Sequence, residues 1–385
     1  MTEPAAIQTA GLNQTLLQLF KRLTAGSAPN TVFSPFSLAV ILAVLAAGAR
    51  NRTRDELRSW LRLGSDPERT MHGLLEQLRS NGDCLLRLAN ALWVREDQPL
   101  LPGAQEDLRR LFEAGLFRAD FSLAKEVADA INDFVRKQTE GKITDLASPD
   151  MIGPDSRLIA VNTLYFNGSW QEPFESDDTE TGTFHLADGT TREIPMMFQC
   201  EYFHYISVPD PAVHGVVLPY KGGDCELIAL MTRSEKDPVE KAIAALNAGA
   251  LNDWIEKAET ETVRLTLPRL TLESELMELK EPLQEAGMDS LFTDGADLSG
   301  FSGRRDLKAD RIIQKVRLEI SERGTEAAAA TEVLVRVLGL PAWMRKNNKI
   351  LDFTVDRPFL LLVRHRTTGL LLFAAAVRDP GAGED

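Results

Sequence analysis

The chain has 385 residues, 44% of them hydrophobic and 26% charged, which is an ordinary globular composition with enough length for a large core. Its formal net charge of -14 argues against a nucleic-acid or polybasic membrane binder, because phosphate contacts need clustered cations. The longest strongly apolar stretch, 38–49, is far shorter than the roughly 20 residues of a membrane-spanning helix. Three cysteines, Cys84, Cys200 and Cys225, are too few and too scattered for a disulfide framework or a zinc site.

The first residues lack a cationic segment followed by an apolar core, so no signal peptide is visible. A reduced cytoplasmic protein is therefore the default expectation, and an extracellular protein whose leader has been removed is the alternative. Length alone suggests two or three domains, but no repeat and no Pro/Gly/Ser linker divides the chain.

The first third of the chain reads as mainly helical, because apolar residues recur at three- and four-residue spacing. The predicted helices cover 6–24, 35–47, 53–61, 67–80 and 126–140. Ser34 is a suitable cap in front of Pro35, and Gly141 closes the last helix. β-branched or alternating stretches then predict strands over 157–166, 216–219, 226–231, 262–267, 311–320, 359–363 and 370–377. Helices first and strands later, without a regular βαβ rhythm, indicate an α+β fold.

The segment 322–340 (ERGTEAAAATEVLVRVLGL) has the most informative pattern. Every second residue from Thr325 to Val337 is small or β-branched, and the intervening set holds every charge. Side chains of a strand alternate between two faces, so this pattern predicts a strand with one buried and one solvated face. Four consecutive alanines favour a helix instead, as expected of a segment with two states. Taken alone, the segment would read as an ordinary strand or a short alanine-rich helix.

The run 322–331 (ERGTEAAAAT) resembles the hinge of the reactive-centre loop in the serpin family. Six further stretches resemble family motifs in the correct order: 30–37 (NTVFSPFS), 131–146 (INDFVRKQTEGKITDL), 158–170 (LIAVNTLYFNGSW), 195–197 with 218–222 (LPYKG), 295–300 (GADLSG) and 356–359 (DRPF). Each is weak alone, but together they identify the chain as a member of the family. The resemblance implies a single domain over 1–385, with helices around a large central mixed β-sheet, two smaller sheets and an exposed reactive-centre loop at about 322–345. We expect the tail at 381–385 to be disordered.

The resemblance also assigns roles to particular residues. The shutter beneath the main sheet, where polar groups control strand separation, comprises Ser34, Ser37, Asn162 and Gln314. The breach at the top of the sheet, where insertion begins, comprises Trp170 and Glu322. The hinge comprises Glu322, Gly324, Thr325, Ala327, Ala329 and Thr331, small enough to slide between two strands, with backbone freedom at Gly324. Without the family, the shutter serines and Asn162 would read as a helix cap or as satisfied core polar groups.

Two positions depart from the family pattern. Gln314 stands where the shutter histidine is usual, so a pH-sensitive shutter is in doubt, although an amide can still bridge to the serine and asparagine groups. Ala375 stands where a glycine is usual near the C-terminus, which we interpret as a packing variation.

Counting from Gly324 at the family's hinge spacing puts the scissile bond between Leu338 and Gly339. Leucine suits proteases with an apolar primary pocket, of the chymotrypsin or subtilisin type. If the loop is two residues shorter on its hinge side, Arg336 is the bait and trypsin-like enzymes are the targets. The following segment, 340–351, is longer than usual for the family, and its cations Arg345, Lys346 and Lys349 read as a solvated charge run rather than an exosite.

No enzyme chemistry is visible. The five histidines lack metal-ligand spacing, and no G-x-S-x-G elbow or phosphate loop exists, so we expect no catalytic residues, no metal and no cofactor. The resemblance implies instead a monomer whose partner is a serine protease, held as a covalent acyl-enzyme complex when the cleaved loop enters the main sheet. The alternative is a non-inhibitory serpin, a binding or chaperone-like protein. Such relatives tend to carry bulky, charged or proline residues on the inserting face, whereas this face is Thr, Ala, Ala, Thr, Val, Val.

Overall fold

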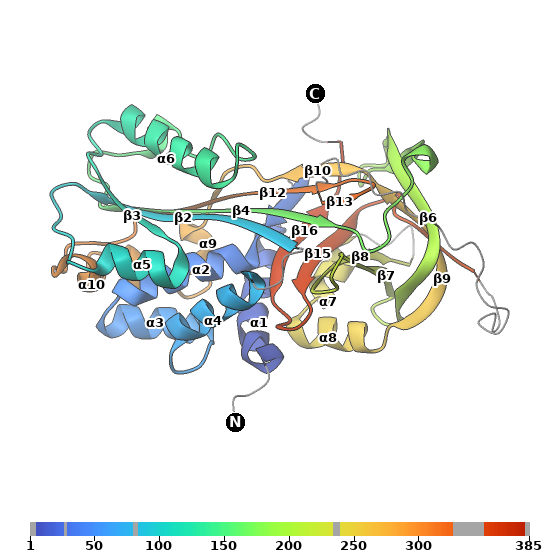
Figure 1. Cartoon of the computed structure of the whole chain (residues 1–385), viewed down its shortest axis with the longest axis horizontal. Coiled ribbons are helices and arrows are strands. Elements are labelled where there is room, and N and C mark those ends of the chain that lie inside the picture. The colour runs from blue at the N-terminus through green and yellow to red at the C-terminus, as the bar shows by residue number, and fades with distance from the viewer. Residues whose placement is uncertain (1–4, 27–28, 80–83, 234–238, 326–349, 382–385) are drawn as a thin grey trace.

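The computed structural model describes residues 5–26, 29–79, 84–233, 239–325 and 350–381. Its strands form a seven-stranded and a nine-stranded sheet, and helices cover both faces of the first (Figure 1). The helices are α1 (Ala5–Leu23), α2 (Pro35–Gly48), α3 (Asn51–Leu61), α4 (Pro67–Arg79), α5 (Ala104–Phe112), α6 (Ala124–Gln138), α7 (Val239–Ala245), α8 (Ala248–Glu256), α9 (Lys280–Glu285) and α10 (Ser299–Ser302). The predicted α+β fold class is confirmed.

The seven-stranded sheet contains both parallel and antiparallel neighbours. It comprises β2 (Cys84–Arg95), β3 (Gly115–Ala119), β4 (Leu158–Ser169), β10 (Leu270–Glu273), β11 (Met277–Glu278), β12 (Arg311–Ile320) and β13 (Gly324–Thr325), in the order β10-β12-β4-β2-β3 with β11 on β12 and β13 on β4. The central pair β4 and β12 is parallel, whereas β2 and β4 are antiparallel. Every residue from Leu158 to Phe166 is buried, since both faces of β4 are covered.

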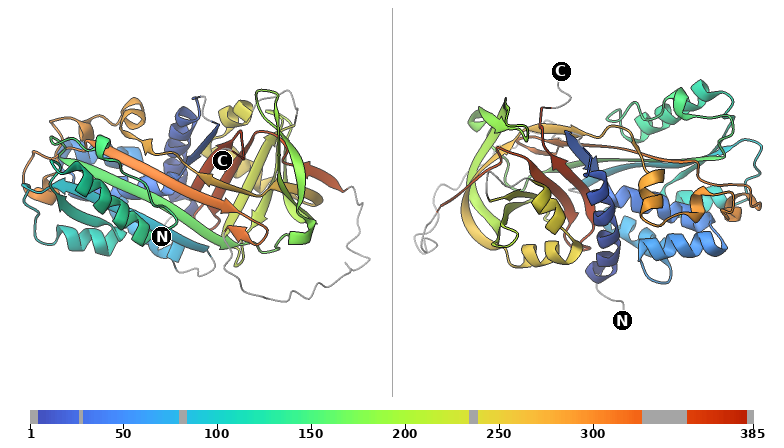
Figure 2. Two further views of the ribbon diagram at one scale, coloured as in Figure 1. Left: turned by 90° about the horizontal axis from the view of Figure 1, so that it is seen from above. Right: turned by 180° about the vertical axis from the view of Figure 1, so that it is seen from behind.

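The nine-stranded sheet curves around the other end of the molecule (Figure 2). It comprises β1 (Asn30–Phe33), β5 (Glu180–His185), β6 (Thr191–Val208), β7 (Val213–Pro219), β8 (Cys225–Thr232), β9 (Glu259–Pro268), β14 (Leu351–Thr354), β15 (Phe359–His365) and β16 (Leu371–Val377). The two smaller sheets implied by the resemblance are continuous here, because β6 is 18 residues long and pairs with β9 along its middle and with β7 at its end.

Helix α2 connects the two sheets. It contacts β4 of one sheet and β16 of the other, and 13 of its 14 residues are buried. A helix that is apolar on all sides must be buried on all sides. Its first turn is fixed locally, because the Ser34 side chain caps it and Pro35 occupies its first position. On the opposite face of the seven-stranded sheet lies α6, whose buried residues include Ile131 and Val135 (Figure 1).

The helices predicted over 6–140 and the seven strands predicted over 157–320 and 359–377 are confirmed, with ends within three residues, whereas the strand predicted from Thr325 to Val337 lies almost entirely outside the described residues. The predicted end of α6 was two residues too late, because Thr139 rather than Glu140 forms the C-cap. Gly141 still closes the turn, since it adopts a left-handed conformation and its N–H donates to the Arg136 carbonyl at 2.8 Å. One hydrophobic cluster contains strands of both sheets, and the extent of a single domain over 1–385 stays a prediction.

Candidate functional site

A row of buried polar side chains crosses the three central strands of the seven-stranded sheet. Asn90 of β2 lies opposite Asn162 of β4, and Asn162 lies opposite Gln314 of β12. The Asn162 amide donates to Asn90 Oδ1 at 2.6 Å, and the Gln314 amide donates to Asn162 Oδ1 at 2.6 Å. None of the three side chains is more than 1% exposed. Hydrogen bonds in such an interior are strong, and losing one partner is costly.

The first turn of α2 completes this polar row. Ser34 Oγ accepts from the Ser37 N–H at 3.1 Å and donates to the Leu372 carbonyl at 2.8 Å, so it is both a helix cap and a link to β16. Gln314 Oε1 accepts from the Ser34 N–H at 3.1 Å. Ser37 Oγ donates to Asn162 Oδ1 at 2.8 Å. The four residues predicted as the shutter therefore lie in one hydrogen-bonded group, around the contact that joins β4 to β12.

Asn90 is a member of this group that the sequence pattern did not reveal. The only signal for it is a single amide in the apolar run of β2, CLLRLANALWVR. A buried amide in such a run needs hydrogen-bond partners, and the Asn90 oxygen accepts from the Asn162 amide. A strand that enters between β4 and β12 would break the Gln314–Asn162 bond. It would not disturb the Asn162–Asn90 bond, which lies on the other side of β4.

A second cluster lies at the end of β4, around Trp170. The Trp170 indole N–H donates to the Ser321 carbonyl at 2.8 Å. Its ring stacks on Tyr220, with 4.6 Å between ring centroids and 17° between planes. Two backbone bonds hold the neighbouring turn, from Trp170 N–H to the Arg323 carbonyl and from Phe174 N–H to the Glu322 carbonyl. Trp170 thus fixes the backbone that leads into the predicted hinge.

The carboxylate of Glu322 is held at the same place. Its Oε1 accepts from the Thr179 hydroxyl at 2.9 Å and from Arg269 Nη1 at 3.2 Å. The Glu322 side chain is 11% exposed and that of Arg269 is 50% exposed, so the ion pair lies at the rim of the cluster. Of the two residues predicted for the breach, Glu322 lies in the turn after β12, and Trp170 donates hydrogen bonds to the carbonyls of Ser321 and Arg323 on either side of it. Thr179, Arg269 and Tyr220 were missed, although Tyr220 stands in the motif LPYKG.

The first hinge residues are already part of the sheet. Gly324 and Thr325 form β13, antiparallel to the end of β4, with Gly324 opposite Ser169 and Thr325 opposite Gly168. Gly324 has φ 138°, and a Cβ there would lie 2.2 Å from the Gly168 carbonyl oxygen, so only glycine fits. The Thr325 side chain is fully buried, with its hydroxyl 2.8 Å from that of Tyr220.

The sheet forks immediately before this point. β4 pairs with β12 through eight registered positions, from Ile159 opposite Arg311 to Phe166 opposite Leu318. At Gly168 and Ser169 its partner is β13 instead. The chain therefore turns back from the end of β12 and begins a new strand beside β4, where the two central strands diverge.

The remaining predicted site residues lie outside the described part of the chain. These are the hinge residues Ala327, Ala329 and Thr331, the bait residues Arg336, Leu338 and Gly339, and the cations Arg345, Lys346 and Lys349. The part of the predicted reactive-centre loop that follows Thr325, and the predicted tail beyond Gly381, lie outside it as well. The roles of the hinge, breach and shutter residues stay predictions, supported by their grouping.

The described residues contain neither a metal-binding cluster nor a membrane-spanning helix. In those ranges no three His, Cys, Asp or Glu side chains are arranged to hold a metal ion. None of the helices in the described ranges has the length and apolarity needed to cross a membrane.

Comparison with known proteins agrees with this geometry. The serpin (serine protease inhibitor) family model matches residues 10–380. Plasminogen activator inhibitor 1 of Bos taurus is 32% identical over 362 residues, covering 91% of this chain and 87% of that protein. Leukocyte elastase inhibitor of Sus scrofa is 32% identical over 377 residues, covering 94% and 97%.

Solved structures show the same fold. Human thyroxine-binding globulin superposes with a TM-score of 0.88 at 25% identity, over 98% of this chain and 99% of that one. Native protease nexin-1, solved with heparin, superposes with a TM-score of 0.85 at 26% identity, over 98% and 100%. Because the family model matches nearly the whole length of the chain, this chain belongs to the serpin family.

Proposed function

We propose that this protein is a suicide-substrate inhibitor of serine proteases that traps the acyl-enzyme by inserting its cleaved loop between β4 and β12. Relatives named as inhibitors, among them leukocyte elastase inhibitor and a serine protease inhibitor of Cyanea capillata, support the inhibitory part of the proposal. The single observation that carries the mechanism is the pairing of Gly324 and Thr325 with β4 at the fork of the sheet.

The β13 register supports insertion as a continuation of an existing strand. Directly opposite residues of antiparallel strands share a face. Extending the register would bring the small residues of the loop opposite core-facing residues of β4: Ala327 opposite Phe166, Ala329 opposite Leu164 and Thr331 opposite Asn162. Phe166 and Leu164 belong to the main hydrophobic cluster. A face of Thr, Ala, Ala and Thr can enter this layer with little steric cost.

The proposed chemistry ends before the protease completes its cycle. The protease serine attacks the Leu338 carbonyl carbon, an ester to Leu338 forms, and the amine of Gly339 leaves with a proton. The freed loop then enters the sheet and carries the protease with it. Distortion of the protease active site prevents water from hydrolysing the ester. In serpins, loop insertion releases strain that is stored in a metastable native state. The insertion step proposed here is carried over from the family.

The driving force has two parts. Insertion exchanges the β4–β12 ladder, with its Gln314–Asn162 bond, for two ladders on the new strand. The net gain is about ten hydrogen bonds at about 0.5–1.5 kcal/mol each. Burial of the small face adds to this at about 25 cal/mol per Å² of apolar surface.

The class of target follows from the bait residue. Leu338 favours chymotrypsin- or subtilisin-like enzymes, because a leucine side chain suits an apolar primary pocket. Arg336 as bait would favour trypsin-like enzymes, whose pocket ends in a carboxylate. The rival function is a non-inhibitory binding protein; among similar folds, thyroxine-binding globulin was solved with thyroxine bound. The pairing of β13 with β4, which is present before any cleavage of the loop, favours the inhibitory function.

The proposal is tested by incubation with chymotrypsin, subtilisin, elastase and trypsin, followed by denaturing gels and mass spectrometry of the released peptide. A gel-stable complex with one of the apolar-pocket enzymes, and a peptide beginning at Gly339, are expected. A peptide beginning at Val337 would assign the bait to Arg336. Cleavage by every enzyme without any covalent complex would contradict the inhibitory function and favour the binding protein.

A further inference from the structure

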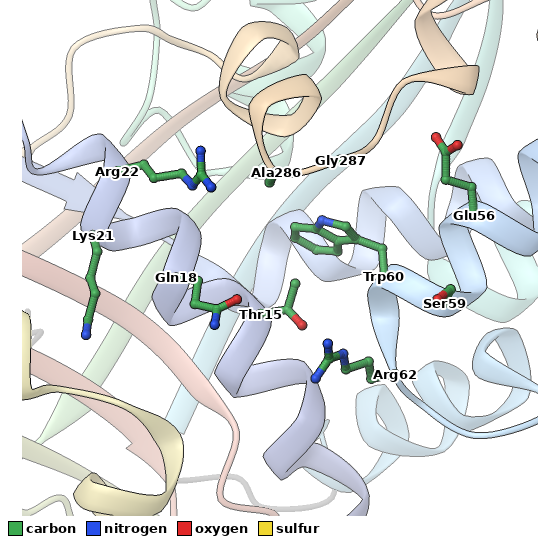
Figure 3. Close-up of a pocket in the computed structure, with 10 residues that line it drawn as sticks. All are labelled: Thr15, Gln18, Lys21, Arg22, Glu56, Ser59, Trp60, Arg62, Ala286 and Gly287. Carbon is green, nitrogen blue, oxygen red and sulfur yellow. The ribbon is translucent and has the colours of Figure 1, made fainter.

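A cavity of about 600 Å³ lies far from the loop hinge, between α1, α3 and the turn after α9 (Figure 3). This volume is within the range of roughly 300–1,000 Å³ that is usual for small-molecule sites. Thr15 and Gln18 of α1 form one wall, Trp60 of α3 forms the opposite wall, and Gly287 lies at the rim. Two helices and a turn thus line a pocket that is open to solvent and has both polar and aromatic walls.

Two guanidinium groups flank this cavity in a protein with a formal net charge of -14. In Figure 3, Arg22 extends from the end of α1 and Arg62 from the residue after α3, on opposite sides of the space. Within the described ranges the Arg62 side chain has no ion pair or hydrogen bond. Arg22 lies 3.8 Å from Glu285, but the side chains are 49% and 68% exposed, which makes this a weak pair.

The other two charged residues of the lining are engaged elsewhere. The Lys21 ammonium donates to the Ala244 carbonyl at 2.6 Å, and Figure 3 shows this side chain directed away from Trp60. A carboxylate oxygen of Glu56 accepts from the Ser290 N–H at 2.8 Å. The lining carries three cations and one carboxylate, so its net charge is positive, and two of the cations are guanidinium groups, which bind planar anions in a bidentate manner.

Trp60 supplies the apolar part of the site. Its side chain is buried, with 8% of the residue exposed, yet the indole N–H has no hydrogen-bond partner in the described ranges. Figure 3 shows this edge of the ring directed toward the turn at Ala286 and Gly287. A buried donor without an acceptor is unfavourable. Apart from Gly287 and its two chain neighbours, no residue has a heavy atom within 4 Å of the position that a Cβ of Gly287 would take, so the space beside this turn is open.

We propose that this cavity binds a small aromatic anion, such as an aryl carboxylate or aryl sulfonate, independently of the inhibitory function. The ring would lie against Trp60, and the long, exposed side chains of Arg22 and Arg62 would close on the anionic group from the two sides of the cavity. An aromatic ring packs well on an indole face, and a sulfonate or carboxylate matches the guanidinium fork.

The test uses naphthalene-2-sulfonate as the probe and the full-length chain. The protein has five tryptophans, so nitrogen-15 labelling gives five indole signals, and Trp60→Phe identifies that of Trp60. Sodium sulfate supplies the anion without a ring, and 2-naphthol supplies the ring without a charge at neutral pH. We expect a saturable shift of the Trp60 signal by naphthalene-2-sulfonate, with a Kd at least about tenfold lower than for either comparator.

Arginine variants locate the anionic group. Arg62→Gln and Arg22→Gln should each raise the Kd about tenfold by loss of a charge-assisted hydrogen bond. Arg69→Gln removes the same charge from the exposed side of α4 and should change the Kd less than about twofold. Should Trp60→Phe fail to fold, calorimetric Kd values of these three surface variants decide the question.

Three results would overturn the proposal. The first is the absence of saturable binding at millimolar probe. The second is equal affinity for sulfate and naphthalene-2-sulfonate, which would indicate an adventitious ion only. The third is an equal loss of affinity in Arg62→Gln and Arg69→Gln, which would indicate unspecific charge attraction. None of these results bears on protease inhibition, since the cavity shares no residue with the hinge, the breach or the shutter.

Discussion

The hydroxyl of Thr325 lies 2.8 Å from the hydroxyl of Tyr220, and both side chains are fully buried. Tyr220 in turn stacks on Trp170, whose indole N–H binds the Ser321 carbonyl. The first residue of the inserting face is therefore already fixed at the end of β4. Further insertion requires β4 and β12 to separate below it, beginning at Phe166 and Leu318.

Thr325→Arg should convert the protein from an inhibitor to a substrate. An arginine at this fully buried position would have to leave the sheet, because burying an unpaired charge costs several kcal/mol. Insertion should slow, so that deacylation completes before the protease is trapped. Denaturing gels with chymotrypsin should show cleaved protein and no covalent complex.

Thr325→Val is the matched control for this variant. It keeps the β-branched shape and leaves only the Tyr220 hydroxyl without this partner, at a cost of about 1–3 kcal/mol. The covalent complex should persist. If Thr325→Arg inhibits with the same stoichiometry as the unmodified protein, insertion through β13 is not part of the mechanism.

Leu338→Arg should move inhibition from chymotrypsin-like toward trypsin-like enzymes. An arginine pairs with the carboxylate of a trypsin-like pocket and is poorly accommodated in an apolar one. The measurement is the association rate with each enzyme, together with the mass of the released peptide. Arg336→Leu is the counterpart, and a larger effect from this change than from Leu338→Arg would make Arg336 the bait.

Gln314→Leu should lower the free energy of unfolding by about 1–3 kcal/mol. The Ser34 N–H would lose its acceptor in a fully buried position, and Asn162 Oδ1 would lose one of its two donors. Urea unfolding followed by fluorescence measures the change. The control is Gln171→Leu at an exposed position. Equal effects of the two substitutions would mean that the buried amide row adds nothing to native stability.

Much of the fold follows from local patterns, and the reasons for the misses are physical. The amphipathic helix α6 and the alternating strand β12 have unambiguous periods, so both were predicted. β2 was not predicted, because CLLRLANALWVR is rich in leucine and alanine and does not differ by period from a buried helix.

The site shows the same division. Ser34, Ser37, Asn162 and Gln314 were grouped by resemblance to a family, and no spacing rule would have joined residues 280 positions apart in sequence. Asn90 and Tyr220 could not be found in this way, because their roles depend on register and stacking. Such contacts exist only after the strands have paired.

Acidification from pH 6.5 to pH 4 should destabilise the protein partly through His214. Burial has the largest effect on the pKa of His214, and the positive charges of nearby Arg233 and Arg357 act in the same direction. Together they lower this pKa from 6.5 to about 4. Between these values the unfolded state binds more protons than the native state, so the free energy of unfolding falls as the pH falls. The ring packs edge-on against Phe353 of β14 and lies 3.0 Å from the Tyr205 hydroxyl.

Urea titrations at pH 7 and pH 5 should show a smaller stability difference for His214→Gln than for the unmodified protein. Some difference should persist, because burial also lowers the pKa of His365. An unchanged pH dependence in His214→Gln would show that this histidine is solvated and titrates normally in the folded protein.

The most direct test of loop insertion is the thermal midpoint of the intact protein against that of protein nicked once between about Val333 and Leu340. A nick frees the end of the loop, and the β13 register then allows about eight to ten further residues to pair with β4, as far as Leu158 when the nick lies beyond Val335. A net gain of about 10 kcal/mol should raise the midpoint by about ten degrees or more on the usual entropy per residue. Nicked Thr325→Arg should gain much less. Overlapping transitions of intact and nicked protein would contradict insertion and leave the binding-protein function as the better account.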